Sequence, residues 1–105
     1  MSPQCLCRIR PIREEFLLDS TAEEDRIVSE HFRYLQQLTR DGVVLLAGRT
    51  LNTDPTSFGI VILEAESDDA ARALMENDPA VRASVFRAEL FPFGVALASP
   101  RVSPP

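Results

Sequence analysis

Two short segments of the sequence, residues 43–47 and 60–63, are apolar at every position. When helices cover only one face of a sheet, each strand alternates apolar and polar side chains. These segments do not alternate, so we expect a sheet that is buried on both faces. A second copy of the chain is the simplest cover, because a large exposed apolar patch is unusual on a monomer. The alternative is a monomer whose C-terminal tail folds over the sheet, but that tail is poor in apolar residues.

The predicted elements alternate in the order strand, helix, strand, strand, helix, strand. The longer helix, residues 21–41, has the clearest signals. Ser20 with Glu23, or Thr21 with Glu24, fits a capping box at its start, and Gly42 is a typical stop. The second helix is expected at 67–77, and the strands at 4–12, 43–47, 59–63 and 88–97.

This order is the split βαβ arrangement of ferredoxin-like folds. We therefore predict one α+β domain over residues 1–98, with an antiparallel sheet, two helices on one face and a disordered tail over 99–105. In the last strand the apolar positions change parity near Pro92. A β-bulge there explains the change, and so does burial of both faces.

Composition narrows the function. The chain has 105 residues and a formal net charge of −5, which argues against nucleic acid or an anionic membrane as partner. All 11 cationic residues are arginines, so Schiff-base chemistry on lysine is excluded. Cys5 and Cys7 lie two residues apart on a strand, a poor geometry for a disulfide. With no signal segment or apolar span, we expect a reduced, cytoplasmic protein.

His31 is the only histidine, and it lies on the apolar stripe of the long helix. Such a histidine is either a core residue with a hydrogen-bond partner or a proton-transfer group. Tyr34, about one turn further, either lines the same pocket or packs the helix. A single histidine with scattered carboxylates gives no reason to expect a metal.

Asp78 ends the second helix, where a carboxylate opposes the helix dipole. It fits the N-cap of a short turn that begins at Pro79, and the residues alone favour this interpretation. Arg8, Arg10 and Arg49 are each able to hold an anionic ligand through paired hydrogen bonds. For each, a solvated charge or an ion pair with an acidic residue is the favoured interpretation.

Several local patterns occur together and in order: Glu30-His31-Phe32, Ala47-Gly48-Arg49-Thr50, Phe58-Gly59-Ile60-Val61, Asn77-Asp78-Pro79-Ala80 and Ala88-Glu89-Leu90-Phe91-Pro92. In this series the chain resembles the YCII-related (YciI-like) family of small bacterial proteins, over nearly all of residues 4–97. The resemblance implies a dimeric α+β barrel of ferredoxin-like subunits. It also implies a pocket in which His31 and Asp78 form an acid–base dyad.

The resemblance implies a small enzyme that works without a cofactor, of lyase, isomerase or dehalogenase type. Some relatives are linked to dehalogenation of chlorinated muconolactones, so a small anionic or lactone-like compound is the expected substrate. The chain departs from the family at Ala83-Ser84, where members often carry Ala-Gly. Ser84 is expected to narrow the pocket or to alter its backbone. The alternative function is a non-catalytic dimer that binds a small ligand.

Overall fold

The structure of the protein is a computed structural model that describes residues 3–102. Residues 1–2 of the predicted domain and 103–105 of the predicted tail lie outside the described residues. The elements follow one another as β1 (Gln4–Pro11), η1 (Glu14–Leu17, a 3-10 helix), α1 (Ala22–Arg40), β2 (Val44–Arg49), β3 (Gly59–Glu64), α2 (Asp68–Glu76), α3 (Pro79–Arg82) and β4 (Phe86–Phe93).

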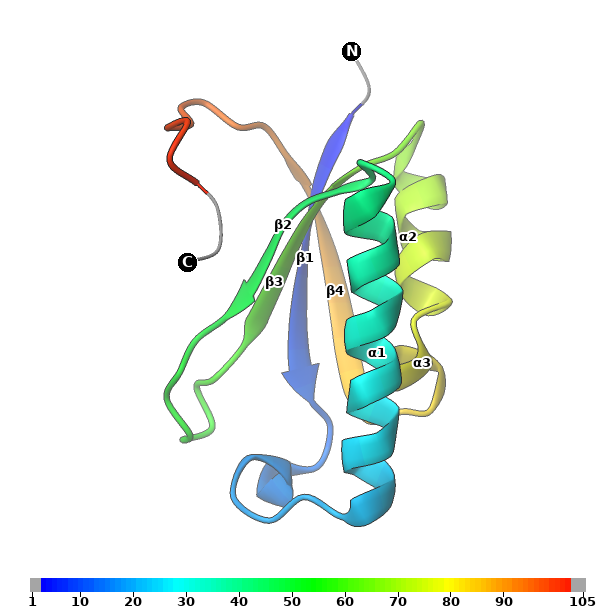
Figure 1. Cartoon of the computed structure of the whole chain (residues 1–105), viewed down its shortest axis with the longest axis vertical. Helices are drawn as coiled ribbons and strands as arrows, with labels where there is room; N and C mark the ends of the chain where they lie inside the picture. The colour runs from blue at the N-terminus through cyan, green and yellow to red at the C-terminus, as the bar shows by residue number, and fades with distance from the viewer. Residues whose placement is uncertain (1–2, 103–105) are drawn as a thin grey trace.

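The four strands form one antiparallel sheet in the order β2-β3-β1-β4. The three α-helices lie on one face of this sheet, and no helix of residues 3–102 covers the other face (Figure 1). The fold is therefore α+β and ferredoxin-like, as predicted. The short helix α3 is an addition that follows from Pro79, which takes the first helical position.

The long helix begins and ends where its sequence signals predict. Of the two possible capping boxes, the structure uses Thr21 with Glu24, and each of these residues bonds the other's backbone N–H. Gly42 stops the helix with φ 77°, a left-handed conformation that suits glycine. Ser67 caps α2 in the same way, by accepting from the N–H of Ala70.

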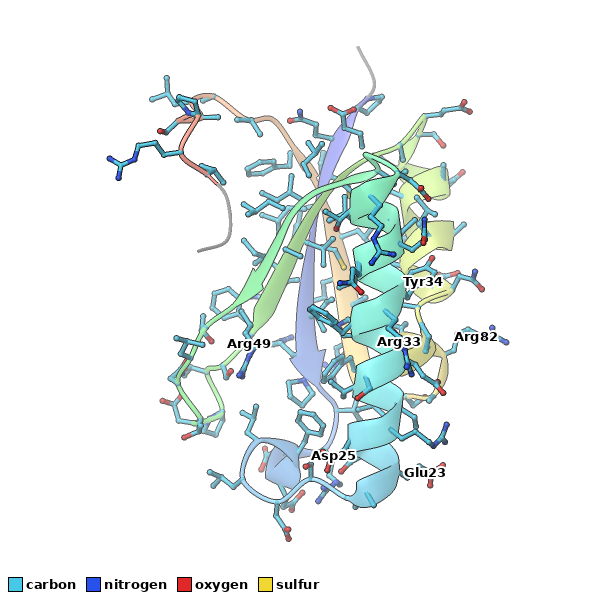
Figure 2. The ribbon with its side chains drawn as sticks, viewed as in Figure 1. Glu23, Asp25, Arg33, Tyr34, Arg49 and Arg82 are labelled. Atoms are coloured by element: carbon cyan, nitrogen blue, oxygen red, sulfur yellow. The ribbon has the colours of Figure 1, made fainter. Side chains whose placement is uncertain are left out.

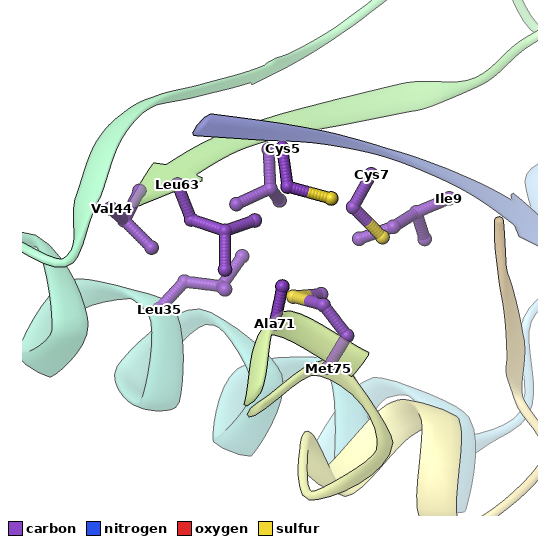
Figure 3. Packing of buried hydrophobic residues seen from close by; sticks show 9 residues of the cluster. Cys5, Cys7, Ile9, Leu35, Val44, Leu63, Ala71 and Met75 are labelled. Atoms are coloured by element: carbon purple, nitrogen blue, oxygen red, sulfur yellow. The ribbon is translucent and has the colours of Figure 1, made fainter. Parts of the chain in front are cut away.

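The core lies between the sheet and the helices (Figure 3). The inward side chains of β1 and β3 are fully or almost fully buried: Cys5, Cys7, Ile9, Val61 and Leu63. From the helices, Leu35, Ala71 and Met75 pack against them. Both cysteines are free, and burial raises the pKa of Cys7 to about 12. The thiols therefore act as small apolar side chains.

Strand boundaries correct two expectations. The last strand is Phe86–Phe93 rather than 88–97, because it begins where Phe86 pairs with Pro11. Its pairing with β1 continues without interruption past Pro92, so of the two explanations for the change of parity the bulge does not hold. The irregularity lies in β2 instead, at Leu45, between Val44 and Leu46.

The helix-free face of the sheet, which we call the outer face, carries the second set of apolar side chains. By register these are Leu6, Leu46, Ile60, Ile62, Phe91 and Phe93. Leu46 is 40% and Phe91 45% exposed. The continuous apolar runs therefore divide between the helix-covered core and the outer face. No helix among residues 3–102 is both long and apolar enough to cross a membrane.

Candidate functional site

A cavity of about 360 Å³ opens on the helix side of the sheet, between α1, η1 and the outward end of the β2–β3 hairpin. In Figure 1 the end of this hairpin, η1 and the first turns of α1 all lie in the lower part of the molecule. Most of the walls are apolar, and aromatic rings form much of them. The lining includes Phe16, His31, Phe32, Arg49, Ser57, Phe58, Gly59 and Phe86.

His31 and Asp78 meet at the inner wall of this cavity. The Nδ1 atom of His31 lies 2.7 Å from Asp78 Oδ2 and 2.9 Å from Oδ1. The Asp78 side chain is completely buried, and that of His31 is 13% exposed. An ionised carboxylate can only accept, so Nδ1 donates, and the neutral ring carries its free electron pair on Nε2. The contact therefore fixes the orientation of the ring, and Nε2 has no hydrogen-bond partner among residues 3–102.

Asp78 does stand at the N-cap position of α3, but its side chain makes no capping bond. The interpretation that the residues alone favoured is therefore wrong about the side chain, which turns to His31 instead. A buried carboxylate is costly unless it is paired or hydrogen-bonded, and His31 supplies that partner. The N-cap backbone, with φ −64° and ψ 132°, aims the carboxylate back toward α1.

Two phenylalanines support the histidine, and sequence reasoning did not single out either. Phe86 stacks edge to face on His31, with 5.1 Å between ring centroids. Phe16 stacks edge to face on Phe86 at 5.4 Å. Phe86 shares the inward parity of Ala88 and Leu90, and that parity was the only available signal.

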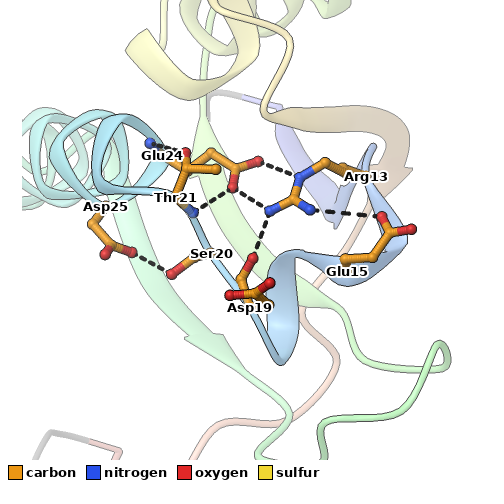
Figure 4. Close-up of polar contacts among 7 residues, drawn as sticks. All are labelled: Arg13, Glu15, Asp19, Ser20, Thr21, Glu24 and Asp25. Atoms are coloured by element: carbon orange, nitrogen blue, oxygen red, sulfur yellow. Dashed lines mark hydrogen bonds and ion pairs between the residues drawn. The ribbon is translucent and has the colours of Figure 1, made fainter.

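The segment η1, which carries Phe16, is held in place by Arg13. The guanidinium donates to both carboxylate oxygens of Glu24, at 2.6 and 3.0 Å, and to the carbonyl of Asp19 at 2.7 Å (Figure 4). Glu24 also closes the capping box with Thr21. Arg13 and the N–H of Thr21 together lower the pKa of Glu24 to about 2. The wall of the cavity is therefore tied to the first turn of α1.

Arg49 is the one arginine among the lining residues, and it lies on β2 across the cavity from α1. It pairs with Gly59, which in turn pairs with Ile9, so the three side-chain positions share the inward parity. Figure 2 shows the Arg49 side chain extending from the hairpin on the side of α1. Ser57, 5% exposed, contributes a hydroxyl nearby in the lining.

Arg8 and Arg10 do not reach the cavity. They lie on the outer face, where both donate to Glu89, at 2.9 Å from Arg8 and 2.7 Å from Arg10. The two arginines lower the pKa of Glu89. The structure thus shows the ion pair that the residues alone favoured.

Tyr34 and Ser84 also lie apart from the cavity lining. The Tyr34 hydroxyl donates to the carbonyl of Leu74 at 2.5 Å, so this side chain packs α1 against α2. Ser84 is exposed in the turn before β4 and has φ 59°. It is not among the lining residues, so it does not narrow this cavity.

The sequence and the fold of the chain match those of known proteins. The YCII-related domain matches residues 3–93. The chain belongs to the YCII-related family. No curated protein matches it. A solved structure with TM-score 0.63 and 25% identity covers 86% of this chain and 93% of its own: 5-chloro-2-hydroxyhydroquinone dehydrochlorinase (TftG) of Burkholderia phenoliruptrix, in complex with 2,5-dihydroxybenzoquinone.

In this YCII-related protein the cavity combines a largely apolar lining with a few polar side chains. No group of three or more histidine, cysteine, aspartate or glutamate side chains converges anywhere in residues 3–102. The polar groups of the cavity are instead an imidazole, a guanidinium and a serine hydroxyl, set among aromatic rings. Such a lining suits a small ring compound that carries oxygen substituents.

Proposed function

We propose that this protein is a small enzyme that uses His31 as its proton-transfer group and Asp78 as the residue that orients it. The observation that carries the proposal is the pair of short contacts from His31 Nδ1 to the buried carboxylate of Asp78, at 2.7 and 2.9 Å. The carboxylate holds the ring in one tautomer and stabilises the imidazolium that forms when Nε2 takes a proton. The same pair then returns the proton.

The reaction type that suits this site is elimination of hydrogen chloride from a small ring compound, or a closely related proton transfer. In the keto tautomer of such a ring the carbon that bears chlorine also carries hydrogen. His31 takes a hydroxyl proton from this tautomer, the released electron pair forms a carbonyl and shifts the adjoining double bond toward that carbon, and the carbon–chlorine bond breaks with loss of chloride. The step is redox-neutral, so it needs no electron acceptor. The similarity to a dehydrochlorinase with 25% identity supports this choice.

Chloride release from 5-chloro-2-hydroxyhydroquinone, the compound in the name of that dehydrochlorinase, tests the proposal directly. We expect release by the wild-type protein and its loss in His31→Ala. Arg33→Gln, an exposed position on α1, serves as the control and keeps the wild-type rate. Equal rates in wild type and His31→Ala contradict the proposal. Binding of ring compounds without turnover supports the alternative, a non-catalytic ligand-binding module.

We also propose that two copies of the chain pair through the outer face. The apolar residues of this face include Leu46 and Phe91, which are 40% and 45% exposed, and Ile62, Ile60 and Leu6 between them. Covering these side chains buries additional apolar surface, and a domain of 105 residues buries only a modest amount by itself. Two such sheets packed face to face form a dimeric α+β barrel. The cavity lies on the opposite side of the sheet and stays open in this dimer.

A further inference from the structure

Arg49 lines the cavity because of the strand register around it, and it is also exposed to solvent. Arg49, Gly59 and Ile9 form a row across β2, β3 and β1. A Cβ atom placed on Gly59 would lie 3.8 Å from the Cβ of Arg49, 3.9 Å from that of Ile9 and 3.3 Å from the carbonyl oxygen of Gly48. Glycine at position 59 therefore leaves space beside the arginine stem at the floor of the cavity.

The backbone next to Arg49 is fixed by a set of hydrogen bonds from the following residue. The N–H of Thr50 donates to the carbonyl of Phe58 at 2.9 Å, and the Thr50 hydroxyl accepts from the N–H of Phe58 at 3.1 Å. The same hydroxyl donates to Ser57 at 3.2 Å. These contacts join the two arms of the hairpin just beyond Arg49, so they fix the backbone from which its side chain extends.

The charge of Arg49 has no counterpart within the described chain. Arg8, Arg10 and Arg13 are each held by a carboxylate. Within residues 3–102, the Arg49 side chain has neither a hydrogen bond nor an ion pair, and no aspartate or glutamate is among the cavity-lining residues. Other arginines without such partners exist, but they lie outside the lining. A guanidinium that faces an apolar cavity lacking a carboxylate is well suited to an anion from outside.

The remaining walls select the shape of that anion. Phe16, Phe32, Phe58 and Phe86 present aromatic surface, and the volume of about 360 Å³ suits a single substituted ring. His31 and Arg49 come from elements on opposite sides of the cavity, α1 and β2. A ring held between them presents its reacting side to Nε2 and an ionised oxygen substituent to the guanidinium.

We infer that Arg49 is the specificity-determining residue of this site, and that the site takes a small, flat ring compound with an ionised oxygen group, an enolate, phenolate or carboxylate. This rests on the proposed function in assigning His31 to the reacting side. The role of Arg49 in anion binding is separable from it. The ligand in the similar dehydrochlorinase structure, 2,5-dihydroxybenzoquinone, has this chemistry, since its enolic hydroxyls are acidic and ionise below neutral pH.

The test is titration calorimetry of the full chain at pH 7 with 2,5-dihydroxybenzoquinone as the anionic probe and hydroquinone as the neutral one. We expect Arg49→Gln to weaken binding of the anion about tenfold to a hundredfold, the range for a hydrogen bond to a charged group. Hydroquinone binding should stay within about twofold, since it offers no charge. Arg49→Lys should recover part of the affinity, and Arg33→Gln should match wild type.

Several results overturn the inference. One is unchanged affinity of Arg49→Gln for the anion. Another is equal weakening for both probes, which shows that Arg49 acts through shape alone. A third is failure of the wild-type protein to bind the anion at millimolar concentration. His31→Ala separates the two proposals: if it still releases chloride, the proposed reaction fails while the binding result for Arg49 stands.

Discussion

His31 and Asp78 are 47 positions apart in the sequence, and their side chains lie 2.7 Å apart at the inner wall of the cavity. One comes from the middle of α1 and the other from the junction of α2 and α3. The contact satisfies a carboxylate that is completely buried and leaves Nε2 as the ring nitrogen without a partner among residues 3–102.

The first prediction concerns this contact. Asp78→Asn keeps the shape of the side chain but removes its charge and offers the ring a donor as well as an acceptor. By analogy with other histidine–carboxylate pairs, we expect turnover to fall about 10⁴-fold. Chloride release from 5-chloro-2-hydroxyhydroquinone measures it, with circular dichroism to verify the fold. A rate within tenfold of wild type, in a folded variant, would show that the carboxylate does not orient the base.

The second prediction concerns pH. The Arg13 guanidinium and the Thr21 N–H hold the pKa of Glu24 at about 2 in the folded chain, against about 4.3 for a free glutamate. A lowered folded-state pKa contributes stability that is complete above the unfolded value and is lost as pH falls toward 2. We expect the free energy of unfolding, from urea titrations, to decline through this window more steeply in wild type than in Glu24→Gln. Parallel pH curves for the two proteins would contradict it.

The third prediction concerns Ser84, whose φ of 59° is unfavourable for a residue with a Cβ atom. Ser84→Gly relieves this strain, partly offset by the greater freedom of glycine in the unfolded chain. We expect the free energy of unfolding to rise by about 1 kcal/mol. The control is Ala83→Gly, where φ is −86° and no strain exists, so this variant should be less stable than wild type. A stability loss in Ser84→Gly would disprove the strain.

The fourth prediction concerns the outer face. If two chains pair through it, light scattering at micromolar concentration should give twice the mass of one chain. Phe91→Asp places a charge within the apolar patch and should give the mass of a single chain. Leu18→Asp, at a position that is 79% exposed outside that face, should leave the mass unchanged. A single-chain mass for the wild-type protein would contradict the proposed dimer.

Much of the fold followed from local signals in the sequence. The capping box at Thr21, the glycine stop at Gly42 and the cap at Ser67 located both main helices. Cys5 and Cys7, two residues apart on the predicted first strand, lie on one face, and the structure buries that face together with Ile9. Strand ends were less predictable, because the start of β4 at Phe86 depends on pairing with Pro11 in β1.

The candidate site was only partly predictable. The family resemblance joined His31 to Asp78, whereas the residues alone favoured a helix cap for Asp78. The surroundings of an arginine side chain are still harder to predict, since Arg8, Arg10 and Arg49 all lie on strands. Register places the first two on the outer face with Glu89 and the third over the cavity.

The sequence by itself determined that the sheet has a second apolar face, because strands 43–47 and 60–63 lack the alternation that a one-sided sheet requires. It also determined the helices, whose caps and periodicity act within a few residues. Only the tertiary structure decided which polar side chains meet. The contact of His31 with Asp78 and the aromatic contacts of Phe86 with His31 and Phe16 join distant segments. The place of Arg49 in the cavity lining, with no side-chain partner among residues 3–102, also depends on strand register rather than on local pattern.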